Sequence, residues 1–253
     1  MKIGIIGSGK LATVLAATCI QEKMQLEFIH SKTKSHAIEF ANKFGTRCID
    51  AIQDIPHHLD YYLVCVNDDA IGKVAQLAPK LNGTIIHFSG SQTIELLSNH
   101  SQYGVIWPIQ SFSNGTFNSL KKIPLLIEAN SETTLEKIKK IAELLSESVL
   151  QVNENERKLY HLAATFVNNF SNHMCTQAAF LLNKEKLHFN LLLPILHETL
   201  RKIEMLSPLE TQTGPAIRHD LKTIETHLDL LKDEPNAKEI YQVITRSIQQ
   251  IHG

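Results

Sequence analysis

Gly7, Gly9 and Ala12 have the spacing Gly-x-Gly-x-x-Ala, directly after the apolar run "KIGII" (2–6) and at the start of the helical run "KLATVLAATCI" (10–20). In such a turn the first glycine makes the bend, the second lets the backbone approach a pyrophosphate, and the small third residue lets the helix pack closely on the strand. The first helical turn offers free N–H groups to the phosphates. The pattern predicts a dinucleotide site comprising Gly7, Ser8, Gly9, Lys10 and Leu11; the alternative is a tight turn and nothing more.

The end of the second expected strand indicates which dinucleotide binds. An NAD enzyme usually presents Asp or Glu there to the adenosine ribose. In this chain the position is taken by His30, followed by Ser31, Lys32, Thr33 and Lys34. Two hydroxyls and two ammonium groups suit a ribose 2′-phosphate, and the run has no carboxylate to repel it. We therefore expect NADP rather than NAD, with a solvated loop and a helix N-cap as the alternative.

Polar residues also follow two later apolar runs. "VNDDAI" (66–71) gives Val66, Asn67 and Asp68, and "HFSGS" (87–91) gives Ser89. Strand ends of this kind meet at the carboxyl edge of a parallel sheet, where ligands bind. We expect these residues to contact the cofactor, although Asp68 or Asp69 could instead be a helix N-cap, and Ser89 with Gly90 could simply turn the chain.

The elements that must position these residues differ between the two halves of the chain. Up to residue 152, short β-rich runs alternate with helical spacing around 10–22, 34–44, 69–79 and 131–146, which predicts a doubly wound, mostly parallel, Rossmann-like α/β sheet. Residues 153–253 contain only helical patterns. We expect a dinucleotide-binding domain at 1–152 and a smaller all-helical domain at 153–253. The expected strands are 2–6, 26–30, 61–66, 84–89, 103–107, 124–129 and 148–152.

Composition excludes several classes of partner. Lys and Arg number 25 against 26 Asp and Glu, without a basic block, so we expect no nucleic acid. The longest aliphatic stretch, "LLLPIL" (191–196), is too short for a bilayer, and the N-terminus lacks a signal-peptide pattern. Four scattered cysteines indicate free thiols and a cytoplasmic location. "HETLR" puts Arg201 where a His-Glu-x-x-His motif needs its second ligand, so we expect no metal.

Four stretches resemble a known family: "IGIIGSGKLA", "WPIQSFS" (107–113), "HLAATFVNNF" (161–170) and "TGPAIRHD" (213–220). The chain resembles the pyrroline-5-carboxylate reductase and 6-phosphogluconate dehydrogenase-like superfamily. More narrowly, it is similar to a family that pairs a Rossmann-like NADP-binding domain with a short helical domain of unknown function. Two positions depart from that family, which often has His-Pro at Trp107-Pro108 and Arg-Gly-Asp at residues 218–220.

The resemblance implies that the first long helix of the second domain supplies the proton for hydride transfer. On that helix His161, Thr165 and Asn168 recur at i, i+4 and i+7, on one face. We expect His161 to be the general acid or base, Asn168 to assist it by hydrogen bonding, and Thr165 to bind substrate. The alternatives are the solvated side of an amphipathic helix and a buried, satisfied amide.

Two further residues are candidates for binding the substrate. Asp220 is explained as the N-cap of the helix that follows it, but this does not explain Arg218, whose planar fork could grip a carboxylate or a phosphate. Trp107, the single tryptophan, could floor the pocket or pack in the core.

The sequence thus predicts an NADP-dependent oxidoreductase. It would transfer a hydride to or from a small-molecule carbonyl or imine in an interdomain cleft. The alternative is a non-catalytic NADP(H)-binding sensor or regulatory protein. The superfamily resemblance and the apolar content of residues 160–206 favour a homodimer.

Overall fold

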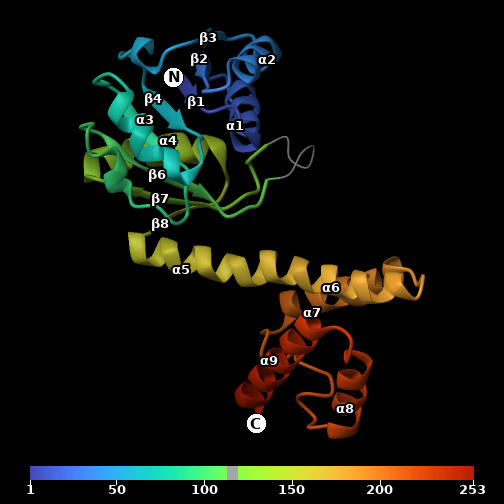
Figure 1. Ribbon diagram of the computed structural model, residues 1–253. Coiled ribbons are helices and arrows are strands. Elements are labelled where there is room, and N and C mark those ends of the chain that lie inside the picture. The colour runs from blue at the N-terminus through green and yellow to red at the C-terminus, as the bar shows by residue number, and fades with distance from the viewer. Residues whose placement is uncertain (113–118) are drawn as a thin grey trace. The chain divides into compact units, whose positions relative to one another are not determined.

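The computed structural model describes residues 1–112 and 119–253 (Figure 1). Ser113, the last residue of the "WPIQSFS" stretch, lies outside the described residues. The chain forms two compact units, Met1–Val167 and Asn168–Gly253. The last strand ends just before Asn153, and the regular structure after it is helical. The helix that begins there, Glu154–Ala164, nevertheless belongs to the same compact unit as the sheet.

The first unit contains a sheet of eight strands among its described residues, in the order β3-β2-β1-β4-β5-β6-β7-β8. All neighbouring strands pair in parallel except β6 and β7, which are antiparallel. The expected doubly wound, mostly parallel, Rossmann-like fold is confirmed. The strands are β1 (Lys2–Ile6), β2 (Gln25–His30), β3 (Arg47–Ile49), β4 (Tyr61–Val64), β5 (Thr84–His87), β6 (Tyr103–Pro108), β7 (Leu125–Ala129) and β8 (Val149–Gln151).

Helices cover both faces of this sheet (Figure 1). On one face α1 (Lys10–Gln21), α2 (Lys34–Phe44) and α4 (Glu132–Leu145) bury their apolar stripes in one core cluster. On the other, α3 (Ile71–Leu77) and the short 3-10 helices η1 (Ile52–Asp54) and η3 (Ile94–Leu97) pack in a second cluster. Another short 3-10 helix, η2 (Asp68–Ala70), precedes α3. Strands buried on both faces read as continuous apolar runs, as "YYLV" does in β4.

The helix α5 (Glu154–Ala164) begins at Asn153 with a capping box: the Asn153 side chain accepts from the Glu156 N–H, and the Glu156 carboxylate accepts from the Asn153 N–H. It continues into a π-helical turn, η4 (Thr165–Phe170). The expected i, i+4, i+7 stripe assumed an α-helical pitch as far as Asn168, and this was wrong because the pitch changes at Thr165.

The second unit is helical throughout its regular structure: α6 (Ser171–Lys184), the 3-10 turn η5 (Phe189–Leu192), α7 (Leu193–Met205), α8 (Leu221–Leu230) and α9 (Pro235–His252), drawn in orange and red in Figure 1. In the described part of this unit only three hydrophobic residues, Ala216, Ile224 and Leu231, are buried. No described helix has both the length and the apolar character needed to cross a membrane.

Candidate functional site

The phosphate-binding turn has the backbone that the sequence predicts. Gly7 has φ +114°, a conformation that L side chains rarely adopt, and a Cβ there would overlap the carbonyl oxygen of Cys65. Its N–H donates to the His30 carbonyl at 2.7 Å, which ties the turn to β2. Ala12 is fully buried where α1 packs against the sheet.

Gly9 is the N-cap residue of α1, and Lys10 and Leu11 begin the helix. An added Cβ at Gly9 would meet nothing within 4 Å. Gly9 is therefore not required by packing, and the open space in front of it leaves room for a pyrophosphate to approach the helix N-terminus. Glycine at this position fits a bound dinucleotide better than it fits a merely tight turn.

The end of β2 lies beside this turn. The hydroxyls of Ser8 and Ser31 are 2.8 Å apart, so the phosphate turn and the β2 loop form one surface. His30 points toward β3, where its Nδ1 is 2.9 Å from the Ile49 carbonyl oxygen. Thr33 holds the N-cap position of α2, but its side chain makes no capping hydrogen bond, so the hydroxyl stays available for a ligand.

The two lysines of this loop differ. Lys34 donates to the Asp50 carboxylate at 2.7 Å, and this pairing raises the pKa of Lys34. Lys32 is exposed and has no ion-pair partner among the described residues. The loop itself contains no carboxylate, but Asp50 after β3 supplies one and pairs with Lys34. Among the described residues, Lys32 is therefore the unpaired lysine of this loop.

The ends of β4 and β5 are joined by a serine–aspartate cluster. Asp68 Oδ2 accepts hydrogen bonds from the Ser89 and Ser91 hydroxyls, each at 2.8 Å. The Ser89 hydroxyl in turn accepts from the N–H groups of Ser91 and Gln92. Asn67, not Asp68, holds the N-cap position of η2, and Ala70 holds that of α3. The capping alternative for Asp68 and Asp69 is therefore wrong. Val66 is partly buried against the core beside this cluster.

Below this cluster His87, the last residue of β5, is fully buried. Burial, together with a smaller contribution from the nearby Arg157 charge, lowers its pKa to about 3. The ring is therefore neutral, and its Nδ1 accepts the Ser89 N–H at 3.1 Å. His87 is a packed support for the turn at Ser89.

Trp107, near the end of β6, lies against His161 of α5. Their ring centroids are 5.4 Å apart with 55° between the planes. Gly90 fits between them: a Cβ on Gly90 would lie 2.6 Å from His161 Cδ2 and 2.6 Å from Trp107 Cε2. Trp107 is 8% exposed and His161 is exposed, so the contact leaves an imidazole open to solvent at the carboxyl edge of the sheet.

Arg157, which the sequence did not single out, is the largest fully buried side chain among the described residues. Its Nε and Nη2 donate to Glu128 Oε2 at 3.2 and 3.1 Å. Its Nη1 donates to the carbonyls of Ser89 and Gly90 at 3.2 and 3.0 Å. Burial raises the pKa of Glu128, and the Arg157 charge opposes that rise. The guanidinium thus joins α5 to the ends of β5 and β7.

The remaining candidates lie at or beyond the π-helical turn. The Thr165 hydroxyl donates to the His161 carbonyl at 3.1 Å, and the Asn168 amide donates to Asn169 at 3.4 Å. In "TGPAIRHD" Gly214 has φ +111°, and Asp220 caps α8 by accepting from the Thr223 N–H at 3.1 Å. Arg218 is exposed in this turn. Asn168 and Arg218 belong to the second unit.

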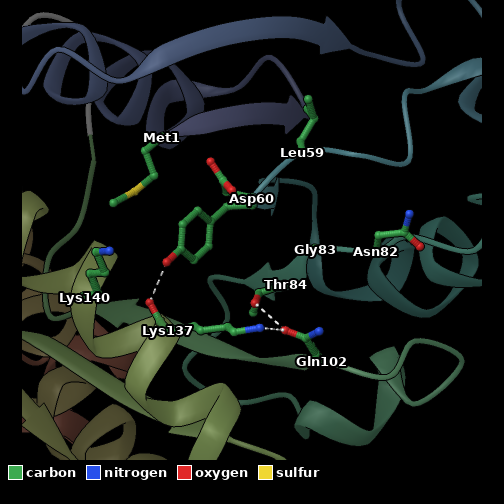
Figure 2. A pocket seen from close by; sticks show the side chains of 10 residues that line it. Met1, Leu59, Asp60, Asn82, Gly83, Thr84, Gln102, Lys137 and Lys140 are labelled. Atoms are coloured by element: carbon green, nitrogen blue, oxygen red, sulfur yellow. Dashed lines mark hydrogen bonds between the residues drawn. The ribbon is translucent and has the colours of Figure 1, made fainter.

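A cavity of about 430 Å³ opens at the opposite edge of the sheet, where β4 and β5 begin (Figure 2). Within it Lys137 Nζ donates to Gln102 at 2.6 Å, and the Thr84 hydroxyl donates to the same amide oxygen at 3.4 Å. Ligands of open α/β sheets bind at the carboxyl ends of the strands. The candidate site is therefore the edge that carries Gly7, Ser89 and Trp107.

Comparisons with known proteins agree with this geometry. Residues 2–86 match a family described as "NADP oxidoreductase coenzyme F420-dependent", and residues 123–248 match a domain of unknown function, DUF2520. A "putative NADP oxidoreductase" from Bacteroides fragilis is 34% identical with a TM-score of 0.88, and the match covers 98% of each chain. No curated protein matches the chain.

Two more distant structures share the fold. An imine reductase from Myxococcus stipitatus in complex with NADP⁺ is 16% identical with a TM-score of 0.71, over 100% of this chain and 96% of that one. A 1-pyrroline-5-carboxylate reductase from Streptococcus pyogenes is 16% identical with a TM-score of 0.62, over 99% and 98%. The resemblance drawn from the sequence is confirmed, and the chain belongs to the family of the Bacteroides fragilis protein. In this chain the NADP oxidoreductase match is followed by the DUF2520 match, which begins just before β7 and continues through most of the helical second unit.

Proposed function

We propose that this protein is an NADP-dependent oxidoreductase that transfers a hydride to or from the carbonyl or imine carbon of a small molecule. The observation that carries the proposal is the exposed His161 imidazole held against Trp107, at the sheet edge where Gly7 and Gly9 form a dinucleotide turn. A proton donor beside the ligand-binding edge is what a hydride-transfer enzyme adds to a nucleotide-binding fold.

Each part of the edge has a role in this proposal. The segment Gly7–Leu11 holds the pyrophosphate, and Val66, Asn67, Asp68 and Ser89 line the nicotinamide end. Bound NADPH supplies the hydride, and His161 supplies or removes the proton on the substrate heteroatom. Trp107 forms the floor under the substrate. Asn168 assists His161, and Thr165 and Arg218 bind the substrate, on the strength of the motif resemblance.

NADP rather than NAD is favoured by the loop after β2. Ser31 and Thr33 present hydroxyls, His30 stands at the position where NAD enzymes carry an acid, and Lys32 is a free cation. Lys34 contributes less because Asp50 already holds its charge. A ribose 2′-phosphate would be met by Lys32 and the Ser8–Ser31 hydroxyl pair.

We also propose that the protein is a cytoplasmic homodimer. Six apolar residues of α7 are between 37% and 69% exposed, namely Leu193, Ile195, Leu196, Leu200, Ile203 and Met205, more than a solvated helix needs. The described cysteines are free thiols, and burial raises the pKa of Cys19 to about 12. Inert thiols of this kind suit a reducing compartment.

The proposed activity is tested by following NADPH oxidation with a panel of aldehydes, ketones and cyclic imines. The wild type is compared with His161→Asn, which keeps a polar side chain but cannot shuttle a proton. Turnover that falls steeply in His161→Asn supports the proposal. Tight NADPH binding with no turnover of any panel member supports the alternative, a non-catalytic NADP(H) sensor.

A further inference from the structure

We infer that Arg157 is a positioning residue: by joining α5 to the ends of β5 and β7, it holds the His161 ring against Trp107 and Gly90. The consequence for the reaction rests on the proposed function, because it requires His161 to be the proton donor. The positional claim itself concerns only residues of the first unit.

The first support is the way α5 is anchored. Arg157 is the only buried residue of this helix, while Leu159, Tyr160 and Leu162 are 66%, 45% and 54% exposed. A helix is normally fixed to a sheet by an apolar stripe, and α5 has none facing the sheet. Ala164, its last residue, packs against the core, and its other anchors are polar: the Arg157 contacts, and a hydrogen bond from the Thr93 hydroxyl to Glu154 at 2.8 Å.

The second support is the spacing of Arg157 and His161. They are four residues apart within the α-helical part of the chain, so both lie on the same face of α5, one turn apart. The contacts that fix the rotation of α5 about its own axis at Arg157 therefore also fix the direction in which the His161 side chain points.

The third support is that Gly90 is shared between the two contacts. Its carbonyl accepts from Arg157 Nη1 at 3.0 Å, while its Cα faces His161 and Trp107. A movement of this turn would change both contacts together. The Arg157 guanidinium and the His161 imidazole thus both contact Gly90.

The chemistry of the anchor explains why an arginine is needed. A buried guanidinium is costly unless its donors are satisfied, and here one carboxylate and two carbonyls satisfy it. A lysine ammonium is a compact point charge without the planar fork, so it cannot reach all three acceptors in the same geometry. Removal of the charge would leave the Glu128 carboxylate without its partner.

The single tryptophan gives a direct readout that needs neither substrate nor cofactor. An imidazole in contact with an indole changes the fluorescence of the indole, so Trp107 emission should differ between the wild type and His161→Asn at the same pH. The emission difference between a protein and its His161→Asn counterpart is called the His161-dependent step, and it reports the contact between the two rings.

In Arg157→Met, with folding confirmed by circular dichroism, the His161-dependent step should be lost, and the emission maximum should shift to the red as Trp107 gains water. Arg157→Lys should restore the step in part. Arg201→Met is the matched control, because Arg201 is an exposed arginine bonded to Glu198 in the second unit, and it should keep the full step. An anchor that contributed only stability would lower the unfolding midpoint and leave the step unchanged.

A folded Arg157→Met protein with a step of wild-type size would overturn the inference, as would a wild type whose fluorescence does not depend on His161. If Arg157→Met does not fold, the same measurement is made on Glu128→Gln, which keeps the guanidinium but removes its charged partner. A reduced step supports the inference and an unchanged step overturns it. NADPH titration of the wild type is read separately, since failure to bind would overturn the proposed function and leave the positional result standing.

Discussion

The imidazole of His161 and the indole of Trp107 are in contact, with ring centroids 5.4 Å apart, although 54 positions separate the two residues in the chain. The contact joins the end of a buried strand to a helix in which Arg157 is the only buried residue. The contact makes this edge a candidate catalytic edge, because it puts an ionisable side chain at the carboxyl ends of the strands, where ligands of such sheets bind.

Gly90→Ala tests the tightness of this contact. The added Cβ would lie 2.6 Å from atoms of both His161 and Trp107, and overpacking of this kind costs about 1–3 kcal/mol. Urea unfolding should show the loss. Gly72→Ala in α3 is the control, because its Cβ would make an ordinary contact at 3.5 Å with Leu96. Equal stability of the two variants would show that the three residues do not pack in this way.

Gly7→Ala and Gly9→Ala separate the two proposed roles of the Gly7–Gly9 turn, the bend of the backbone and the close approach of a pyrophosphate. Gly7 has φ +114° and no room for a Cβ, so its substitution should lower both the free energy of unfolding and the affinity for NADPH. Gly9 has open space, so Gly9→Ala should keep its stability yet bind NADPH more weakly, because the methyl group occupies the path of the pyrophosphate. Wild-type affinity in Gly9→Ala would mean that no phosphate approaches that position.

His87 should make the protein sensitive to acid. Its pKa is about 3 in the folded protein and near 6.5 when unfolded, so the unfolded state binds more protons between these values. The stabilisation is complete above about pH 6.5 and is lost as the pH falls toward 3, on the order of a few kcal/mol in all.

Urea unfolding at pH 7 and pH 4 measures this loss. His87→Asn keeps an acceptor for the Ser89 N–H but cannot take up a proton, so it should lose less stability between the two pH values than the wild type. Burial also lowers the pKa of His100 and raises that of Glu128, and both groups are common to the two proteins, so the difference isolates His87. Identical pH dependence would mean that His87 is not buried.

Asp220→Ala and Arg218→Ala divide the "TGPAIRHD" stretch into its two functions. Asp220 accepts from the Thr223 N–H and hydroxyl at the start of α8, so its loss should lower the urea midpoint. Arg218 is exposed, so Arg218→Ala should unfold like the wild type and instead raise KM for a turned-over substrate. A stability loss in Arg218→Ala with unchanged KM would assign the arginine a structural role.

Most of the sheet could be predicted from the sequence because its strands are buried on both faces. "KIGII" and "YYLV" are short apolar runs, and their ends agree with β1 and β4 within two residues. The strand β3 was missed because "RCI" carries no apolar run and exists through its pairing with β2. The π-helical turn at Thr165 was missed because its sequence continues the same apolar spacing as the α-helix before it.

The candidate site was predicted where it depends on local pattern and missed where it depends on long-range contact. The glycine turn is a sequence motif, and its backbone has the expected form at Gly7. Arg157 stands in "NENERKLY", a charged stretch that reads as a solvated helix start. It is buried only because Glu128 and the Ser89–Gly90 carbonyls meet it in the folded chain, and no spacing rule reveals this.

The central claim is that the protein binds NADP(H) at the Gly7 turn, with Lys32 recognising the 2′-phosphate. Its most direct test is a titration of the wild type, Lys32→Ala and Lys34→Ala with NADPH and with NADH, followed by nicotinamide fluorescence. We predict that the wild type prefers NADPH, and that Lys32→Ala weakens NADPH binding about tenfold, as for the loss of one charge-assisted hydrogen bond, and leaves NADH binding unchanged. Lys34→Ala, whose ammonium is already paired with Asp50, should have the smaller effect. Binding of neither nucleotide by the wild type would contradict the claim.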